Sequence, residues 1–171
     1  MLITRTWAMP SPATFNIPPI SLLLDRWLRD CAVVVDPFSG DSLRGTLRND
    51  LRDGMEATAW LDTLQCEADA VLFDPPYSPR QITEAYKRVG LAVGIRETQN
   101  ARLYKDVKDR LDRLLRPGGI AICCGWNSAG FGKVRGYELL EILLVAHGGA
   151  HNDTIVTVER KLPRNGQGSI T

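Results

Sequence analysis

The sequence contains few of the residues that build metal centres and disulfide frameworks. Among its 171 residues are two histidines and four cysteines, and no two cysteines form a CxxC pair. The adjacent Cys123 and Cys124 would point to opposite faces of a strand, so their spacing does not favour a disulfide. His147 and His151 lack carboxylate or cysteine partners at ligand spacing. We therefore expect reduced, mostly buried thiols in a cytoplasmic protein, and no metal site.

Long apolar runs and a large net charge are also missing. No stretch of about 18 apolar residues indicates a membrane span, and the N-terminal MLITRTWAMP lacks the apolar core of a signal peptide. The net charge of +1 argues against a generic electrostatic grip on nucleic acid. The charge is uneven, however, because the segment from Ser78 to Arg116 holds ten basic and five acidic residues. We expect no membrane partner, and basic surface only in that segment.

Apolar segments of two kinds alternate along the first two thirds of the chain. Short, continuous apolar runs at 32–35, 70–73 and 120–124 predict buried parallel strands. Residues 45–48 are a further possible strand. Between them, amphipathic patterns predict helices near 18–27, 55–64, 78–91 and 102–116. This alternation predicts an α/β fold with a doubly wound, mostly parallel sheet.

The two ends of the chain differ from this pattern. Residues 137–146 and 154–160 form strand-like runs around a glycine-rich turn, which predicts a C-terminal antiparallel hairpin at the sheet edge. Residues 1–14 contain two prolines and no periodicity, so we expect an arm, and residues 163–171 form a polar tail. No linker divides the chain, so we expect one domain over 1–171.

Three acids lie at the ends of predicted strands. Asp36 and Asp74 directly follow the apolar runs 32–35 and 70–73, and Asp50 follows the possible strand 45–48 after Asn49. In doubly wound sheets, ligands bind beyond the carboxyl ends of the strands, near the point where the strand order reverses. We therefore expect these carboxylates to surround a ligand site.

The third acid opens a tetrad with chemical meaning: Asp74, Pro75, Pro76 and Tyr77. A nucleobase amino group is a poor nucleophile because its lone pair is delocalised into the ring. A carboxylate and a backbone carbonyl that accept its two N–H groups would aim that lone pair at a methyl donor. The prolines restrict the backbone, and the tyrosine offers a stacking face for an extruded base. The alternative is that Asp-Pro-Pro only ends a strand.

Four segments carry a resemblance to a known family. They are TFNIPPI at 14–20, DPFSG at 36–40, Asp50, and DPPY at 74–77. Together with LLRPGG at 114–119, they resemble the adenine-specific (amino) DNA methyltransferases, most of all the small members found in phages and prophages. The resemblance implies a Rossmann-like S-adenosylmethionine-dependent methyltransferase fold and methyl transfer to N6 of adenine in DNA, with the adenine flipped out.

The resemblance also implies roles for individual residues. Asp74 would hold the amino group, Pro75 would supply the backbone acceptor, and Tyr77 would stack on the base. Asp50 would bind the ribose of S-adenosylmethionine, with Asp53 as the alternative if the strand is longer, and Asp36 could attract the ammonium group. The implied cofactor-binding residues are Phe15, Ile17, Pro19, Asp36, Phe38, Gly40, Asp50 and Glu56. Phe15 could instead pack on the following helix, and Glu56 could only cap one.

The sequence departs from the family in two places. Asp41 and Ser42 follow Gly40 where the family usually has another glycine, and only residues 78–104 remain for target recognition. Basic residues of that segment are candidates for contacts with DNA phosphates: Arg80, Lys87, Arg88, Arg96 and Arg102. An exposed amphipathic helix is the alternative, and a second subunit in a homodimer could supply missing contacts.

Other targets and another class of function stay open. The tetrad is compatible with N4 of cytosine, with RNA or with a protein amide. A non-catalytic DNA-binding module with a methyltransferase-like fold is the alternative outside enzymes.

Overall fold

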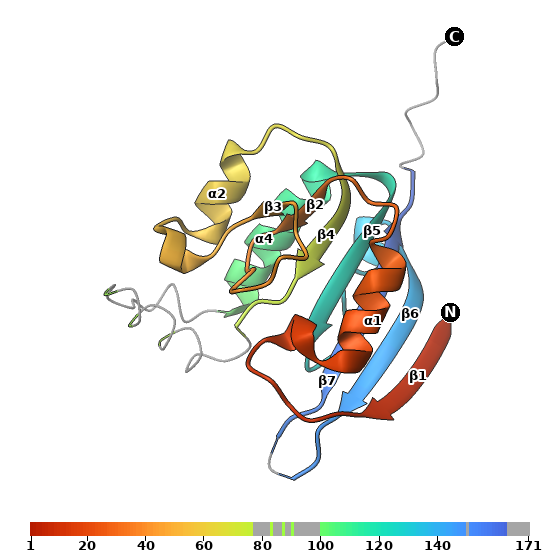
Figure 1. The fold of residues 1–171 in the computed structure, drawn as a ribbon. Helices are drawn as coiled ribbons and strands as arrows, with labels where there is room; N and C mark the ends of the chain where they lie inside the picture. Colours follow the sequence, from red (N-terminus) through yellow and green to blue (C-terminus); the bar gives the residue numbers. More distant parts are fainter. Residues whose placement is uncertain (77–82, 84–86, 88–89, 91–99, 150, 164–171) are drawn as a thin grey trace.

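The computed structural model describes residues 1–76, 83, 87, 90, 100–149 and 151–163 (Figure 1). Its strands are β1 (Leu2–Trp7), β2 (Val34–Asp36), β3 (Leu47–Arg48), β4 (Ala68–Phe73), β5 (Leu115–Gly125), β6 (Tyr137–Ala146) and β7 (Thr154–Lys161). Its α-helices are α1 (Pro18–Trp27), α2 (Ala57–Thr63) and α4 (Asn100–Leu114). Short 3-10 turns are η1 (Thr14–Asn16), η2 (Leu51–Asp53) and η3 (Lys133–Arg135). The helix expected over 78–91 lies largely outside the described residues.

The strands form one mixed sheet in the order β1-β6-β7-β5-β4-β2-β3. Strands β2, β3, β4 and β5 pair in parallel, and β7 is antiparallel to both β5 and β6. The chain runs from β2 outward to β3, and then from β4 in the opposite direction to β5. The strand order therefore reverses between the adjacent strands β2 and β4, where a doubly wound sheet opens a ligand crevice.

Two apolar layers cover the sheet (Figure 1). Helix α1 starts with prolines in its first turn and buries Ile20, Leu23 and Leu24 against one face. Helices α2 and α4 cover the other face, with Leu61, Val107 and Leu111 among the buried residues. Successive strand residues alternate between the layers. Cys124 belongs to the α1 layer and Cys123 to the other, as expected for neighbours on a strand.

The N-terminal segment differs from the expected arm. Residues Leu2–Trp7 form β1, which pairs in parallel with β6 at the edge of the sheet. All six residues are exposed, so burial imposes no alternating pattern that a sequence could reveal. Backbone pairing with β6 holds the strand. The hairpin β6–β7 is confirmed as antiparallel, but β1 covers its outer side, so the expectation that the hairpin forms the edge is wrong.

The stretch Leu114–Gly119 joins a helix to a strand, as expected, but with an irregular course. Helix α4 ends at Leu114 and β5 begins at Leu115. The pairing with β4 then shifts, because Ala68 faces Leu115 whereas Ala70 faces Ile120. None of the described helices is long and apolar enough to cross a bilayer.

Candidate functional site

The candidate site lies where β2 and β4 end side by side. Val35 of β2 pairs with Val71 of β4, and the next acids along the two strands are Asp36 and Asp74. A cavity of about 610 Å³ opens beyond these strand ends. This volume falls within the range typical of small-molecule sites, about 300–1,000 Å³.

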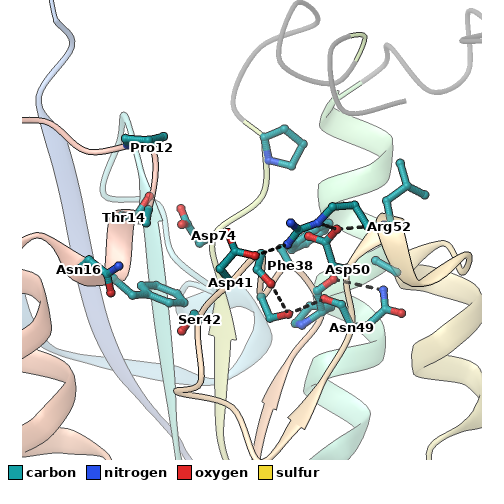
Figure 2. Close-up of a pocket in the computed structure, with 18 of the residues that line it drawn as sticks. Pro12, Thr14, Asn16, Phe38, Asp41, Ser42, Asn49, Asp50, Arg52 and Asp74 are labelled. Atoms are coloured by element: carbon teal, nitrogen blue, oxygen red, sulfur yellow. Dashed lines mark hydrogen bonds and ion pairs between the residues drawn. The ribbon is translucent and has the colours of Figure 1, made fainter. Parts of the chain in front are cut away.

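Five parts of the chain line the cavity (Figure 2). The N-terminal wall is formed by 12–16, around η1. The loop 37–42 after β2 and residues 49–52, 56 and 57 around η2 form the opposite wall. Asp74, Pro76 and Leu103 complete it. Figure 2 shows Thr14 and Asp74 facing the same space from different chain segments, with Asp50 and Arg52 on the far side and Asp41 between them and Asp74.

The loop after β2 is fixed by hydrogen bonds to the end of β3. Asn49 N–H donates to the Asp36 carbonyl at 2.9 Å, and Ser39 N–H donates to the Asn49 carbonyl at 3.0 Å. Gly40 follows with a φ of +53°, and a Cβ there would meet no atom within 4 Å. The glycine therefore turns the chain in the left-handed region and leaves open space over the cavity.

Asp36 lies beneath this loop and is fully buried. Its Oδ1 accepts the Phe38 N–H at 3.1 Å, whereas its Oδ2 has no hydrogen-bond partner among the described residues. Burial raises the pKa of Asp36 to about 7, with the charges of Asp74 and Asp50 adding to the effect. Asp36 is therefore a buried carboxyl group whose charged form is destabilised. It lies next to the cavity but is not one of the residues that line it.

Asp50 lines the cavity directly, at the start of η2. Its Oδ1 accepts the Arg52 N–H at 2.9 Å and Arg52 Nε at 2.8 Å. Although burial opposes it, hydrogen bonds from Arg52 hold the pKa of Asp50 below its usual range. Arg52 Nη2 also lies 3.0 Å from Asp41 Oδ1 and thereby joins η2 to the loop after β2. Asp53, the alternative acid, instead accepts the Asp50 N–H at 3.1 Å and does not line the cavity.

Asp74 lies partly exposed in the cavity, directly after β4. Burial raises its pKa to about 7, and a hydrogen bond from the Thr14 side chain opposes that rise. Pro76 lines the cavity, whereas Pro75 is buried and does not line it. Tyr77 lies outside the described residues. The structure thus brings the tetrad's carboxylate to the same cavity as Asp50 and Gly40.

The remaining residues expected at the cofactor occupy different places. Phe15, Phe38 and Glu56 line the cavity, and Glu56 precedes α2 at its N-cap. Ile17 is buried in the α1 layer, and Pro19 lies in the first turn of α1; neither lines the cavity. The structure therefore places three of these five residues at the site.

The basic residues expected to contact nucleic acid lie mostly beyond the described part of the chain. Arg80, Arg88 and Arg96 fall outside it, and Lys87 is exposed. Arg102 is exposed on α4, with Nε 3.8 Å from Asp106 Oδ2. Most other bases of α4, and Arg116 at the start of β5, also pair with acids: Lys105 with Asp109, Arg110 and Arg113 with Asp62, and Arg116 with Asp69. Much of the positive excess on α4 is therefore an exposed helix face held by ion pairs.

His147 has a structural role at the edge of the sheet. The two ring nitrogens of His147 lie 2.9 Å from the Ala8 carbonyl and from Thr154 Oγ1, where they join β1 to the hairpin. The four cysteines are free thiols, and within the described residues no cluster of three or more potential ligands could hold a metal.

Four residues at the site had no clear signal in the sequence. Thr14 reaches Asp74 from 60 positions away, and the Tyr104 hydroxyl of α4 donates to the Pro76 carbonyl. Asn49 donates from Nδ2 to the Met55 carbonyl at 3.2 Å, and Arg52 binds two acids. The only indication of these four residues in the sequence is that Asn49 directly follows a predicted strand and precedes Asp50.

No protein-family model matches this sequence, and no curated protein matches it significantly. Solved structures resemble it at low identity. TrmN from Thermus thermophilus aligns with a TM-score of 0.52 and 21% identity over 85% of this chain, which spans about half of TrmN (49%).

Two further crystal structures cover more of their own length. One is the 1,6-didemethyltoxoflavin-N1-methyltransferase of Burkholderia thailandensis, with bound 1,6-didemethyltoxoflavin and S-adenosylhomocysteine. It aligns with a TM-score of 0.53 and 17% identity over 85% of this chain and 77% of its own. The other is a precorrin-6y C5,15-methyltransferase from Geobacter metallireducens, with a TM-score of 0.52 and 16% identity over 91% and 94%. These likenesses show a Rossmann-like methyltransferase fold and confirm the fold class expected from the sequence.

Proposed function

We propose that this chain is an S-adenosylmethionine-dependent methyltransferase that methylates N6 of adenine in DNA. One observation carries the proposal: the Asp74 carboxylate opens into the same cavity as the loop after β2, at the reversal of strand order. A carboxylate that binds an amino group and a loop suited to a methyl donor therefore share one cavity. The resemblance of DPPY and DPFSG to the adenine-specific family supports the assignment of the target.

The residues present fit the proposed cofactor. Asp50 presents a carboxylate to the cavity for two ribose hydroxyls, and Gly40 leaves space where a Cβ would project. The buried Oδ2 of Asp36, which lacks a partner among the described residues, marks a position that favours a nearby cation such as an ammonium group. Phe15 and Phe38 provide apolar walls. A structural neighbour with the same fold contains S-adenosylhomocysteine, which further supports this cofactor.

Bound S-adenosylmethionine would supply an electrophilic methyl group. The chain's own contribution is positioning. The Asp74 carboxylate accepts one N–H of the target amino group, a backbone carbonyl of the loop accepts the other, and the nitrogen lone pair then faces the methyl group. Because the pKa of Asp74 is raised to about 7, the carboxylate form that accepts this hydrogen bond increases as pH rises through neutrality. Tyr77 would stack on the extruded base.

The choice of DNA rests on the resemblance and on the basic composition of 78–104. We propose Arg80, Lys87, Arg88, Arg96 and Arg102 as residues that bind phosphates, and a second copy of the chain as a source of further binding surface. The salt dependence of DNA binding tests each of these residues, because the salt slope falls by about one when a side chain that neutralises a phosphate is removed.

The test is methyl transfer from labelled S-adenosylmethionine to unmethylated genomic DNA, with RNA and protein in parallel reactions. The Asp74→Ala variant should lose at least about 100-fold in rate, because the amino group is no longer oriented. Nucleoside analysis should find the label as N6-methyladenine. Label on N4 of cytosine would keep the chemistry and change the base. Label only on RNA or protein, or cofactor binding without transfer to any of them, would contradict the proposal.

A further inference from the structure

A tyrosine outside the tetrad contacts the catalytic loop. Tyr104 lies near the start of α4 and is partly buried, and its hydroxyl donates a hydrogen bond to the Pro76 carbonyl. Proline lacks an N–H, so the Asp74–Pro76 loop cannot be held by N–H donors of its prolines. A hydrogen bond to a loop carbonyl from another element is therefore an effective way to fix its course.

Aromatic contacts fix the position of Tyr104 itself. Its ring packs edge-on against Phe73, the last residue of β4, with centroids 5.7 Å apart. Phe73 in turn packs edge-on against Phe38 of the loop after β2, at 5.9 Å. Lys108 Nζ lies 4.9 Å from the centroid of the Phe73 ring, one helical turn after Tyr104, and donates to the Gly130 carbonyl. These contacts hold the Tyr104 ring against the end of β4, the strand that directly precedes Asp74.

The hydroxyl also keeps its proton. Burial raises the pKa of Tyr104 to about 12, and the charge of Asp74 adds to the effect. A phenolate could not donate to a carbonyl, so the hydrogen bond persists across the pH range in which Asp74 titrates. Tyr104 is accordingly a constant donor beside a carboxyl group whose ionisation changes near neutrality.

We propose that Tyr104 is a positioning residue, which holds the Asp74–Pro76 loop so that its carboxylate and backbone acceptor meet the target nitrogen together. The inference rests on the proposed function. Tyr104 acts through Pro76 and not on the substrate, so its removal should lower kcat and leave cofactor affinity and KM for DNA nearly unchanged. It should also leave the pH at which activity rises unchanged.

Tyr104→Phe removes the hydroxyl and keeps the ring. Because a displacement of about 1 Å can cost about 100-fold in rate, we expect kcat to fall between about 10- and 100-fold. Tyr137→Phe is the matched control. Its hydroxyl donates to Asp112 Oδ1 at 2.8 Å in the α4 layer, away from the cavity. Both variants lose one hydrogen bond, so both should lower stability by a similar amount. Tyr137 does not hold the Asp74–Pro76 loop, so Tyr137→Phe should leave kcat within about twofold of the wild type.

A readout independent of activity is the 13C resonance of the Pro76 carbonyl in protein labelled at proline carbonyls, assigned by its disappearance in Pro76→Ala. We expect this resonance to move in Tyr104→Phe and not in Tyr137→Phe. Three results would overturn this inference and leave the proposed function standing. They are a moved resonance with wild-type kcat in Tyr104→Phe, an equal fall of kcat in both variants, and a resonance that does not move in Tyr104→Phe. No transfer by the wild type to any DNA would overturn the proposed function, and the inference with it.

Discussion

Asp36 and Asp74 follow adjacent parallel strands and precede a proline, yet the structure uses them differently. Asp36 is fully buried and turns back on its own loop, where its Oδ1 accepts the Phe38 N–H. Asp74 lines the cavity. The residue two positions after Asp74 is Pro76, which has no N–H to offer. The second proline therefore prevents the turn that folds Asp36 under its loop, and the Asp74 carboxylate lies at the cavity instead.

The pKa of each acid is raised to about 7, mainly by burial. A ligand cannot contact the fully buried Asp36 carboxylate, so only a nearby cation, such as the ammonium group proposed above, offsets this free-energy cost there. Asp74 lines the cavity, where a substrate can contact it and offset the same cost. The same local sequence, a strand followed by Asp-Pro, thus gives a buried acid in one loop and a proposed catalytic acid in the other.

The largest expected effect comes from removing the buried charge. A carboxyl pKa raised from 3.8 to about 7 means that the folded state holds its proton more tightly than the unfolded state. The stability that this group contributes is therefore fully present below about pH 4 and falls as pH rises towards 7, by about 4 kcal/mol. Asp36→Asn should be more stable than the wild type at pH 8 and should lose the part of the decrease that is due to Asp36, while the part due to Asp74 remains.

Urea unfolding of the ligand-free protein between pH 5 and 8 measures this effect. Asp41→Asn, at an exposed carboxylate on the same loop, is the control and should not stabilise the protein. If the free energy of unfolding of Asp36→Asn depends on pH as that of the wild type does, the pKa of Asp36 is not raised in the folded state.

The next effect separates the two acids of η2. Asp50→Ala should weaken S-adenosylhomocysteine binding by about 10- to 100-fold, since a hydrogen bond to a charged group contributes about 1.5–3 kcal/mol. Asp53→Ala should change the affinity much less, because Asp53 only accepts the Asp50 N–H and lies outside the cavity. Calorimetric titration of both variants makes the comparison. Equal decreases in affinity would place the ribose elsewhere or give η2 a purely structural role.

A smaller effect tests the difference between the two loops directly. Pro76→Ala adds an N–H two residues after Asp74, at the position that Phe38 holds after Asp36. We expect the Asp74 carboxylate to accept it, which lowers its pKa below 7 and turns it from the substrate. Methyl transfer should fall about 10-fold, and the rise in activity should move to lower pH.

Pro75→Ala is the control for Pro76→Ala, because its new N–H lies one residue too early for the same turn. A pH profile of kcat for both variants decides the matter. If Pro76→Ala keeps the wild-type profile, the absence of an N–H at Pro76 is not what opens Asp74 to the cavity.

Much of the fold and part of the site could be predicted from the sequence. Asp36, Asp50 and Asp74 were placed correctly at strand ends, because apolar runs precede Asp36 and Asp74 and a short strand-like segment precedes Asp50. Strand β1 was missed because all its residues are exposed, so burial imposes no pattern on its sequence, and its place depends on backbone pairing with β6. Thr14 and Tyr104 were missed because their contacts with Asp74 and Pro76 depend on tertiary packing, which leaves no local pattern.

The most direct test of the account is a single turnover with labelled S-adenosylmethionine already bound, comparing the wild type with Asp74→Ala on unmethylated DNA. The account predicts that the variant binds the cofactor as well as the wild type and transfers methyl at least about 100-fold more slowly to N6 of adenine. Transfer at the wild-type rate by Asp74→Ala would contradict it.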